Sequence, residues 1–232
     1  MERRVALGDP AFDPFALLDS SPQAVAREPR RGYYSRGYLP HIDIHAYQFI
    51  TFRLNDSFPK ALIQKLSAEL SDLSESERRR ETYRQTEAIV DSGHGNCWLR
   101  RPEVANIVEA QLLFHAEERY DLAAWTIMPN HVHLLARFRE GYPLPKVVQS
   151  WKARSARRAN VVLGRSGSFW YRDFFDRYIR DEEHFWNCLN YIDANPVKAG
   201  LCREPSQWQW GSARLQLDRN ALPSATRRST LA

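Results

Sequence analysis

Residues 121–138 read DLAAWTIMPNHVHLLARF, and this stretch decides the fold class. Its first part, DLAAWTIM, is apolar on both faces of an extended chain, which is typical of a strand inside a sheet. Pro129 and Asn130 then supply a turn. In the last part, HVHLLARF, the alternation of side chains predicts a second strand. The stretch therefore predicts a β-hairpin, and its second strand carries His131 and His133 on one face.

The segments on either side of the hairpin complete an α+β pattern. Upstream we expect a buried strand over residues 41–54 and then a helix after Ser57, followed by a charged, exposed extension of that helix. The helix carries on one side Leu62, Leu66, Leu70 and Leu73. A loop at 91–102 and a second helix around 104–114 follow. Downstream we expect a basic helix over 144–163, an aromatic strand over 168–180, and a helix from Asp181 that ends by Asn195 because Pro196 follows. This order predicts a ferredoxin-like sandwich, in which helices pack on a central antiparallel sheet.

Length and composition fit one folded domain with flanking segments. The 232 residues are 43% hydrophobic and 26% charged, which argues against disorder and against a collagen-like or coiled-coil chain. No apolar run is long enough for a membrane span, and the start lacks a secretory apolar region, so we expect a cytoplasmic protein without a membrane partner. Three cysteines without a CxxC pair indicate neither a disulfide framework nor a structural zinc site. We expect an irregular arm over residues 1–32, a domain over 33–214, and a polar, disordered tail over 215–232.

Basic and aromatic residues gather between residues 146 and 180. The net charge of +5 is modest, but nine of the basic residues lie in this segment beside only two acids, with Trp and Phe side chains between them. Cations that meet phosphates and rings that stack on bases suit single-stranded nucleic acid. The alternative is a solvated basic helix face followed by an aromatic core strand. The residues expected to contact DNA are Arg36, Lys152, Arg154, Arg157, Arg158, Arg165, Arg172 and Arg177.

The histidine pair and the last helix carry the candidate chemistry. Imidazole is the commonest metal ligand, and His131 and His133 could share one ion, although paired histidines on a strand also act as polar spacers. On the helix, Tyr191 and Asn195 are one turn apart and could reach the same point of the sheet. Alternatively, Tyr191 packs through its ring and Asn195 caps the helix.

At this point the sequence resembles a known family. WTIMPNHVHLL is similar to the HUH motif (His, hydrophobic residue, His) of the IS200-like tyrosine transposases, and residues 169–201, which end in NYIDANPVKAGL, resemble the nucleophile region of the REP-associated tyrosine transposases. QWQWGSA is similar to a Trp-x-Trp segment that follows in that family. The resemblance runs from about residue 33 to residue 214, with the segments in family order.

The resemblance implies a metal-dependent endonuclease and strand transferase for single-stranded DNA. It assigns His131, His133 and Asn195 as ligands of Mg²⁺ or Mn²⁺, and Tyr191 as a nucleophile that forms a 5′-phosphotyrosine adduct. Hairpin-forming palindromic repeats are the implied substrate, and a homodimer is one of the assemblies that it leaves open. One departure is Asp193, where a neutral or aromatic residue is common; its carboxylate could tune the metal or face solvent.

Several alternatives stay open on the sequence. Tyr171 and Tyr178 are rival nucleophiles, and His184 is a rival third ligand on the helical stripe of Tyr191. His94 is expected in a loop, and His45 as a structural or DNA-facing residue. The runner-up function is a DNA-hairpin-binding protein whose nuclease site is vestigial, and a third possibility is a hydrolase of small phosphoesters, which leaves Tyr191 without a role.

Overall fold

Four antiparallel strands form the main sheet of the computed structural model, which describes residues 33–35, 40–42, 46–58, 70 and 73–215. The strands are β3 (Gln48–Arg53), β4 (Tyr120–Ile127), β5 (His131–Phe138) and β6 (Phe175–Tyr178). They lie in the order β4-β5-β3-β6, so the first and third strands of this sheet along the chain are its central pair. Along the chain, α2 (Glu75–Asp91) and α3 (Pro102–Leu113) connect β3 to β4, a turn joins β4 to β5, and α4 (Leu144–Val162) connects β5 to β6. This βαββαβ connectivity with the observed strand order is the ferredoxin-like arrangement, and the predicted fold class is confirmed.

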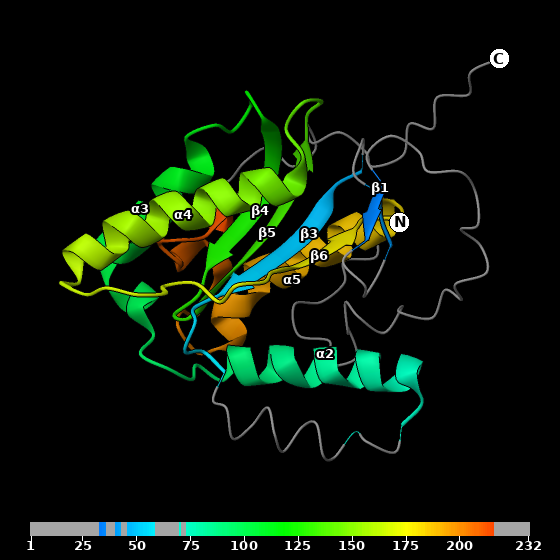
Figure 1. Cartoon of the computed structure of the whole chain (residues 1–232), viewed down its shortest axis with the longest axis horizontal. Coiled ribbons are helices and arrows are strands. Elements are labelled where there is room, and N and C mark those ends of the chain that lie inside the picture. Colours follow the sequence, from blue (N-terminus) through cyan, green and yellow to red (C-terminus); the bar gives the residue numbers. More distant parts are fainter. Residues whose placement is uncertain (1–32, 36–39, 43–45, 59–69, 71–72, 216–232) are drawn as a thin grey trace.

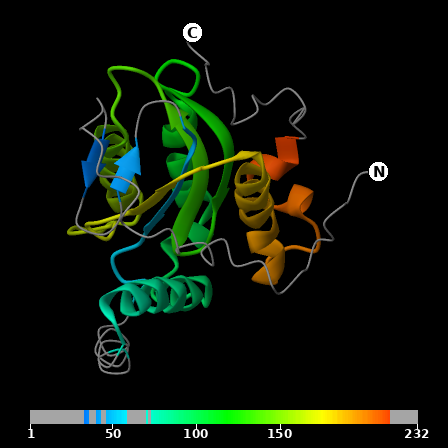
Figure 2. The ribbon, with the colours of Figure 1, turned by 90° about the vertical axis from the view of Figure 1, so that its right-hand side faces the viewer.

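The two faces of the sheet carry separate hydrophobic cores. On one face, side chains such as Ile50 and Leu134 pack against α3 (Pro102–Leu113) and α4 (Leu144–Val162). On the other face, Phe49 and Leu135 pack against α5 (Glu182–Lys198). Figure 2 shows α5 and α4 on opposite sides of the sheet. Because side chains alternate along a strand, the two histidines of β5 share the face of Leu135 and lie under α5.

The helix α2 (Glu75–Asp91) lies below the sheet in Figure 1. It begins at Ser74, where a capping box with Glu77 supplies partners for the first free N–H groups. The charged segment is therefore a separate helix, and the prediction that it extends a preceding one is wrong. Leu70 lies in a turn and Leu73 in a bend, not on that expected helix, whose other positions, Leu62 and Leu66, lie outside the described residues.

The end of α5 also differs from the prediction. Pro196 lies inside the helix, which continues to Lys198 instead of stopping at Asn195. A proline removes one intrahelical hydrogen bond, but the turn continues because the N–H of Ala199 bonds to the Asn195 carbonyl and that of Leu201 to the Pro196 carbonyl. Pro196 is also buried, so packing against the domain offsets part of its cost.

The predicted strand over 41–54 is divided in the structure. Its end forms β3, whereas β2 (Pro40–Ile42) pairs with β1 (Tyr33–Ser35) in a small sheet of its own, and residues 43–45 lie outside the described residues. The aromatic stretch 168–180 forms a strand only at β6. The expected arm over 1–32 and tail positions 216–232 are not described, so these boundaries stay predictions.

The last described segment closes one edge of the sheet. After η2 (Trp98–Arg100) near the start of α3, two more short helices, η3 (Pro205–Gln207) and η4 (Ser212–Leu215), complete the described chain. The carbonyl of Trp210 accepts the N–H of Ile127, and the Ser212 hydroxyl accepts that of Trp125. The outer strand β4 is thereby covered over these residues. Across the described ranges, no helix has the length and apolar character that a bilayer span requires.

Candidate metal centre and active site

The two histidines of β5 face each other at the centre of the site. Their Nε2 atoms lie 2.9 Å apart, and both side chains are almost fully buried. The Nδ1 atom of His133 lies 2.7 Å from the Thr51 hydroxyl on the neighbouring strand β3, and that of His131 lies 2.8 Å from Oδ1 of Asn130. The Nδ1 partners orient both rings, which turns both Nε2 atoms toward the same point.

Asn130 also fixes the hydrogen on His131. Its amide nitrogen donates to the carbonyl oxygens of Val90 and His94, at 2.9 and 3.0 Å, so the amide oxygen is the atom that faces the ring. An oxygen can only accept, so Nδ1 of His131 carries a hydrogen, and in the neutral ring Nε2 then keeps its lone pair. The same side chain therefore holds the end of α2 against the turn between β4 and β5 and orients the His131 ring.

Asp91, the last residue of α2, completes a three-membered cluster. Its Oδ1 lies 3.3 Å from Nε2 of His131 and 3.9 Å from Nε2 of His133. With the 2.9 Å between the two Nε2 atoms, these distances are the sides of a triangle formed by three possible ligand atoms. The point at equal distance from all three atoms lies about 2.0 Å from each, which is close to a metal–ligand bond length. Among the described residues, these three are the group of His, Cys, Asp or Glu side chains whose possible ligand atoms all lie within 4.8 Å of one another. The donor set fits a divalent cation.

The charges of the cluster agree with this fit. Burial, together with the neighbouring His131, lowers the pKa of His133 to about 4 against the attraction of Asp91. His133 is therefore neutral at pH 7 and can offer a lone pair. Burial raises the pKa of Asp91, but its contacts with the two histidines outweigh burial and leave that pKa below its usual range. An anionic carboxylate and a neutral imidazole are the forms that bind metal.

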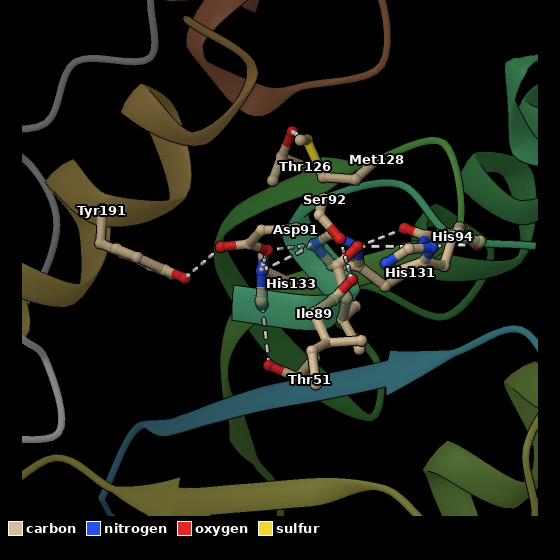
Figure 3. A network of polar contacts seen from close by, with 12 residues as sticks. Thr51, Ile89, Asp91, Ser92, His94, Thr126, Met128, His131, His133 and Tyr191 are labelled. Carbon is tan, nitrogen blue, oxygen red and sulfur yellow. Dashed lines mark hydrogen bonds and ion pairs between the residues drawn. The ribbon is translucent and has the colours of Figure 1, made fainter. Parts of the chain in front are cut away.

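Tyr191 reaches the cluster from α5. Its hydroxyl donates to Oδ2 of Asp91 at 3.5 Å, and its ring packs edge-on against His133, with ring centroids 5.4 Å apart. Figure 3 shows the phenol pointing from α5 toward Asp91 and the histidines. The Phe49 ring also packs edge-on against the Tyr191 ring, with centroids 5.9 Å apart, and the Lys198 Nζ atom lies 5.3 Å from the Tyr191 centroid. Tyr191 thus lies beside the cluster, and its role as the nucleophile stays a prediction.

The other predicted ligands of α5 differ in their surroundings. Asn195 is 2% exposed, lies one turn beyond Tyr191, and has an amide nitrogen for which the described residues offer no hydrogen-bond partner. Its role as a ligand stays a prediction. His184 is not a member of the three-residue cluster; its Nδ1 accepts the N–H of Arg180. Asp193 is also outside the cluster, and it is buried, so the expectation that it could face solvent is wrong.

The rival tyrosines have different surroundings. Tyr178 pairs with Gln48 of β3, whereas His133 pairs with Thr51 of the same strand. Gln48 and Thr51 are three positions apart and so point to opposite faces, which places Tyr178 on the face of the sheet opposite to the histidines. The Tyr171 ring lies under the guanidinium of Arg53, 3.8 Å from it. His94 lies in an exposed loop, as expected, and His45 lies outside the described residues.

The predicted DNA contacts fall into an exposed group and a structural group. Arg154, Arg157 and Arg158 line a shallow hollow between α4 and the end of α3, beside Phe114, which is 65% exposed. This hollow lies on the sheet face opposite to the histidines. Arg172 is exposed but is not among the residues that line this hollow, and Arg36 is outside the described residues.

Three of the predicted cations take part in local structure. The ammonium of Lys152 donates to the carbonyls of Tyr171 and Arg172 at 2.7 Å, which ties the segment before β6 to α4. Arg165 donates to the Ser168 carbonyl and lies near the Phe169 ring, whereas Arg177 is buried. Their contact with DNA stays a prediction.

Sequence reasoning missed Asp91, Asn130 and Thr51 as parts of the site. Asp91 precedes His131 by a helix and a strand, and its one local signal is its position just before a glycine-punctuated turn. The sequence indicates Asn130 only as a turn residue. These residues become neighbours of the histidines because α2 ends against the β4–β5 turn, which no short-range pattern records.

The fold and the site together define a class of protein: an antiparallel α+β domain with a His-His-carboxylate group suited to a divalent cation and a tyrosine beside it. Residues 103–195 match the family described as "Transposase IS200 like". This segment runs from α3 through the histidines to Asn195, so the predicted resemblance to this family is confirmed over these residues.

Two relatives and one solved structure show the extent of the similarity. A Haemophilus influenzae protein named as a putative REP-associated tyrosine transposase is 28% identical over 109 residues, which cover 40% of this chain and only 58% of the relative. The REP-associated tyrosine transposase of Escherichia coli is 23% identical over 49% of this chain and 70% of its own length. A solved REP-associated tyrosine transposase bound to a REP hairpin is 17% identical with a TM-score of 0.48, covering 82% of this chain and 87% of that chain.

Proposed function

We propose that this protein is a metal-dependent endonuclease and strand transferase for single-stranded DNA, with hairpin-forming repeats as substrate. The observation that carries the proposal is the position of the Tyr191 hydroxyl beside the Asp91–His131–His133 cluster. A nucleophile next to a cation site is the arrangement that phosphoryl transfer requires. The names of the relatives, REP-associated tyrosine transposases, support the same reaction and the same class of DNA.

In this proposal His131 and His133 hold a Mg²⁺ or Mn²⁺ ion, with Asn195 as a further ligand. The ion supplies positive charge to the scissile phosphate, whose own oxygens otherwise repel a nucleophile. The hydrogen bonds from Nδ1 to Asn130 and Thr51 keep both rings in place during the reaction. Ligands that are hydrogen-bonded in this way on a rigid sheet are held more precisely than ligands on loops.

Tyr191 performs the covalent step. Its Oη forms a bond to phosphorus while the bond between phosphorus and the 3′ oxygen breaks; the phenol loses its proton and the 3′ oxygen gains one. The products are a 5′-phosphotyrosine and a free 3′-hydroxyl. The reverse reaction with another 3′-hydroxyl transfers the strand without an external energy source, because the number of phosphoester bonds does not change.

The hollow beside α4 supplies the DNA-binding surface in this proposal. Arg154, Arg157 and Arg158 meet phosphates, and the exposed ring of Phe114 is available to a base or sugar. Since this hollow and the tyrosine lie on opposite faces of the sheet, a hairpin held at α4 presents its single-stranded flank to the site around an edge of the sheet.

A covalent-adduct assay tests the function. Labelled hairpin oligonucleotides from the DNA that flanks the gene are mixed with the protein and Mn²⁺ or EDTA, and adducts are resolved by denaturing electrophoresis. We expect an adduct with Mn²⁺ that EDTA and Tyr191→Phe each abolish. Hairpin binding without any adduct would support the vestigial binding protein instead, and an adduct in the Phe variant would move the nucleophile to Tyr171 or Tyr178.

A further inference from the structure

We propose that Asp91 is a further catalytic residue of this site: one carboxylate oxygen binds the metal ion and the other aligns the Tyr191 hydroxyl. The inference rests on the proposed function and adds a residue that lies outside the segment matched to the transposase family. Asp91 belongs to α2, ahead of that segment, so this chain brings its own carboxylate to the histidine pair.

The two oxygens of Asp91 have different neighbours. Oδ1 lies 3.3 Å from Nε2 of His131, whereas Oδ2 accepts the Tyr191 hydroxyl at 3.5 Å. Because both oxygens belong to one rigid planar group, fixing the carboxylate fixes the distance between the cation position and the nucleophile. Figure 3 shows Asp91 between Tyr191 and the histidines, which is the place such a bridge must occupy.

Oδ1 is also a buried oxygen that lacks a well-formed hydrogen bond within the described residues. A buried acceptor left in this state is costly unless something else compensates it. In the neutral His131 ring, Nε2 carries a lone pair when Nδ1 holds the hydrogen and does not donate to Oδ1, and Nε2 of His133 is too far away to donate, at 3.9 Å. A divalent cation satisfies Oδ1 and both nitrogens at once.

The position of Asp91 is set by the fold. The preceding carbonyl, that of Val90, accepts the Asn130 amide at 2.9 Å, and the same asparagine orients His131. The Val90 side chain is itself fully buried. The carboxylate and the imidazole are thus held by one common side chain, as expected for a ligand set that must keep its geometry during a reaction.

The alternative is that Asp91 only forms an ion pair with a protonated His131. This alternative and the proposal differ in what a metal ion does. An ion pair needs no metal and competes with it for the imidazole, so removing the carboxylate would leave Mn²⁺ binding unchanged or would strengthen it. If Asp91 is a ligand, its removal weakens Mn²⁺ binding.

The test compares the full-length protein with Asp91→Asn, Asp91→Ala, Tyr191→Phe and Glu140→Gln. Glu140 is an exposed acid just beyond the far end of β5, so its substitution is the matched control for the loss of one carboxylate charge. Mn²⁺ affinity is measured without DNA by titration calorimetry and by the rise in melting temperature that Mn²⁺ causes. The rate of adduct formation on hairpin oligonucleotides is measured separately at saturating Mn²⁺. Melting in EDTA establishes that each variant is folded.

We expect both Asp91 variants to bind Mn²⁺ at least about tenfold more weakly than the wild type, and to form adduct at least about a hundredfold more slowly at saturating Mn²⁺. Tyr191→Phe should bind Mn²⁺ as the wild type does, and Glu140→Gln should match it in both assays. Wild-type Mn²⁺ affinity, or a wild-type adduct rate, in Asp91→Asn would overturn the proposal. A wild type that binds Mn²⁺ but forms no adduct refutes the proposed function, and the affinities then still decide whether Asp91 is a ligand.

Discussion

Replacing Asn130 by alanine should damage both stability and metal binding, because this side chain links three parts of the site. It is 1% exposed and makes hydrogen bonds to the Val90 carbonyl, the His94 carbonyl and the His131 ring. Alanine removes the bonding partner of all three, and the Val90 carbonyl and the His131 ring are left without it in buried surroundings. Each lost bond costs about 0.5–1.5 kcal/mol net, and somewhat more where the partner stays dry.

The expected loss is therefore about 2–4 kcal/mol in the free energy of unfolding, or a fall of about 5–15 °C in melting temperature for a domain of this size. Urea unfolding in EDTA measures the stability without any contribution from metal. Mn²⁺ affinity of the folded variant should also fall about 10–100-fold, because His131 loses the acceptor that sets its tautomer and Asp91 loses its anchor.

Asn106→Ala is the matched control. Asn106 is an exposed asparagine whose amide oxygen accepts one hydrogen bond, from the Trp210 indole. We expect this variant to lose about 1 kcal/mol and to keep its Mn²⁺ affinity. If Asn130→Ala cost no more stability than Asn106→Ala, or if it bound Mn²⁺ as tightly as the wild type, the role assigned to Asn130 would be refuted.

Three further predictions concern other parts of the chain. Burial, with smaller contributions from nearby arginines, lowers the pKa of His184 to about 4. On acidification the unfolded chain therefore binds this proton before the folded chain does, and the stability falls as the pH drops from about 6.5 toward 4. In urea unfolding, His184→Gln should lose about 1–2 kcal/mol less free energy of unfolding between pH 7 and pH 5 than the wild type. The double variant Arg157→Ala, Arg158→Ala should bind hairpin DNA more weakly and reduce the slope of log affinity against log salt by about 1–2, measured by fluorescence anisotropy. Burial raises the pKa of the Cys188 thiol to about 12, so maleimide at pH 7 should modify the partly exposed Cys202 in the native protein and leave Cys188 unmodified until the chain unfolds.

Each of these results has a clear contrary outcome. An equal loss of stability on acidification in the wild type and in His184→Gln would show that another group controls this pH range. An unchanged salt slope would remove the hollow beside α4 from the DNA-binding surface. Modification of Cys188 at the rate of Cys202 would mean that the core under α5 opens readily, since Cys188 is 1% exposed.

Local sequence patterns determined much of the frame. The pattern of residues 131–138 predicts a strand with its observed bounds, and the alternation of HVHLLARF places both histidines on one face. The starts of the helix at Leu144 and of the helix carrying Tyr191 are also predicted to within a residue. These features follow from periodicities of about two and 3.6 residues, which depend only on neighbours in the chain.

Local rules failed where packing outweighed them. Pro196 predicts a helix end, yet α5 continues through it because the residue is buried and the carbonyls around it find other donors. Tertiary packing and hydrogen bonding therefore stabilise the continued helix by more than the local preference opposes it.

The sequence by itself determined which residues could do the chemistry on the sheet, and the tertiary structure decided which of them meet. His131, His133 and Tyr191 have recognisable types and spacings, so they could be singled out before the fold was known. Asp91 has no such spacing; it joins them because α2 ends against the turn that Asn130 holds. A hydrogen bond between residues 40 positions apart leaves no periodic trace in the sequence, and only the folded chain brings the fourth group of the site into place.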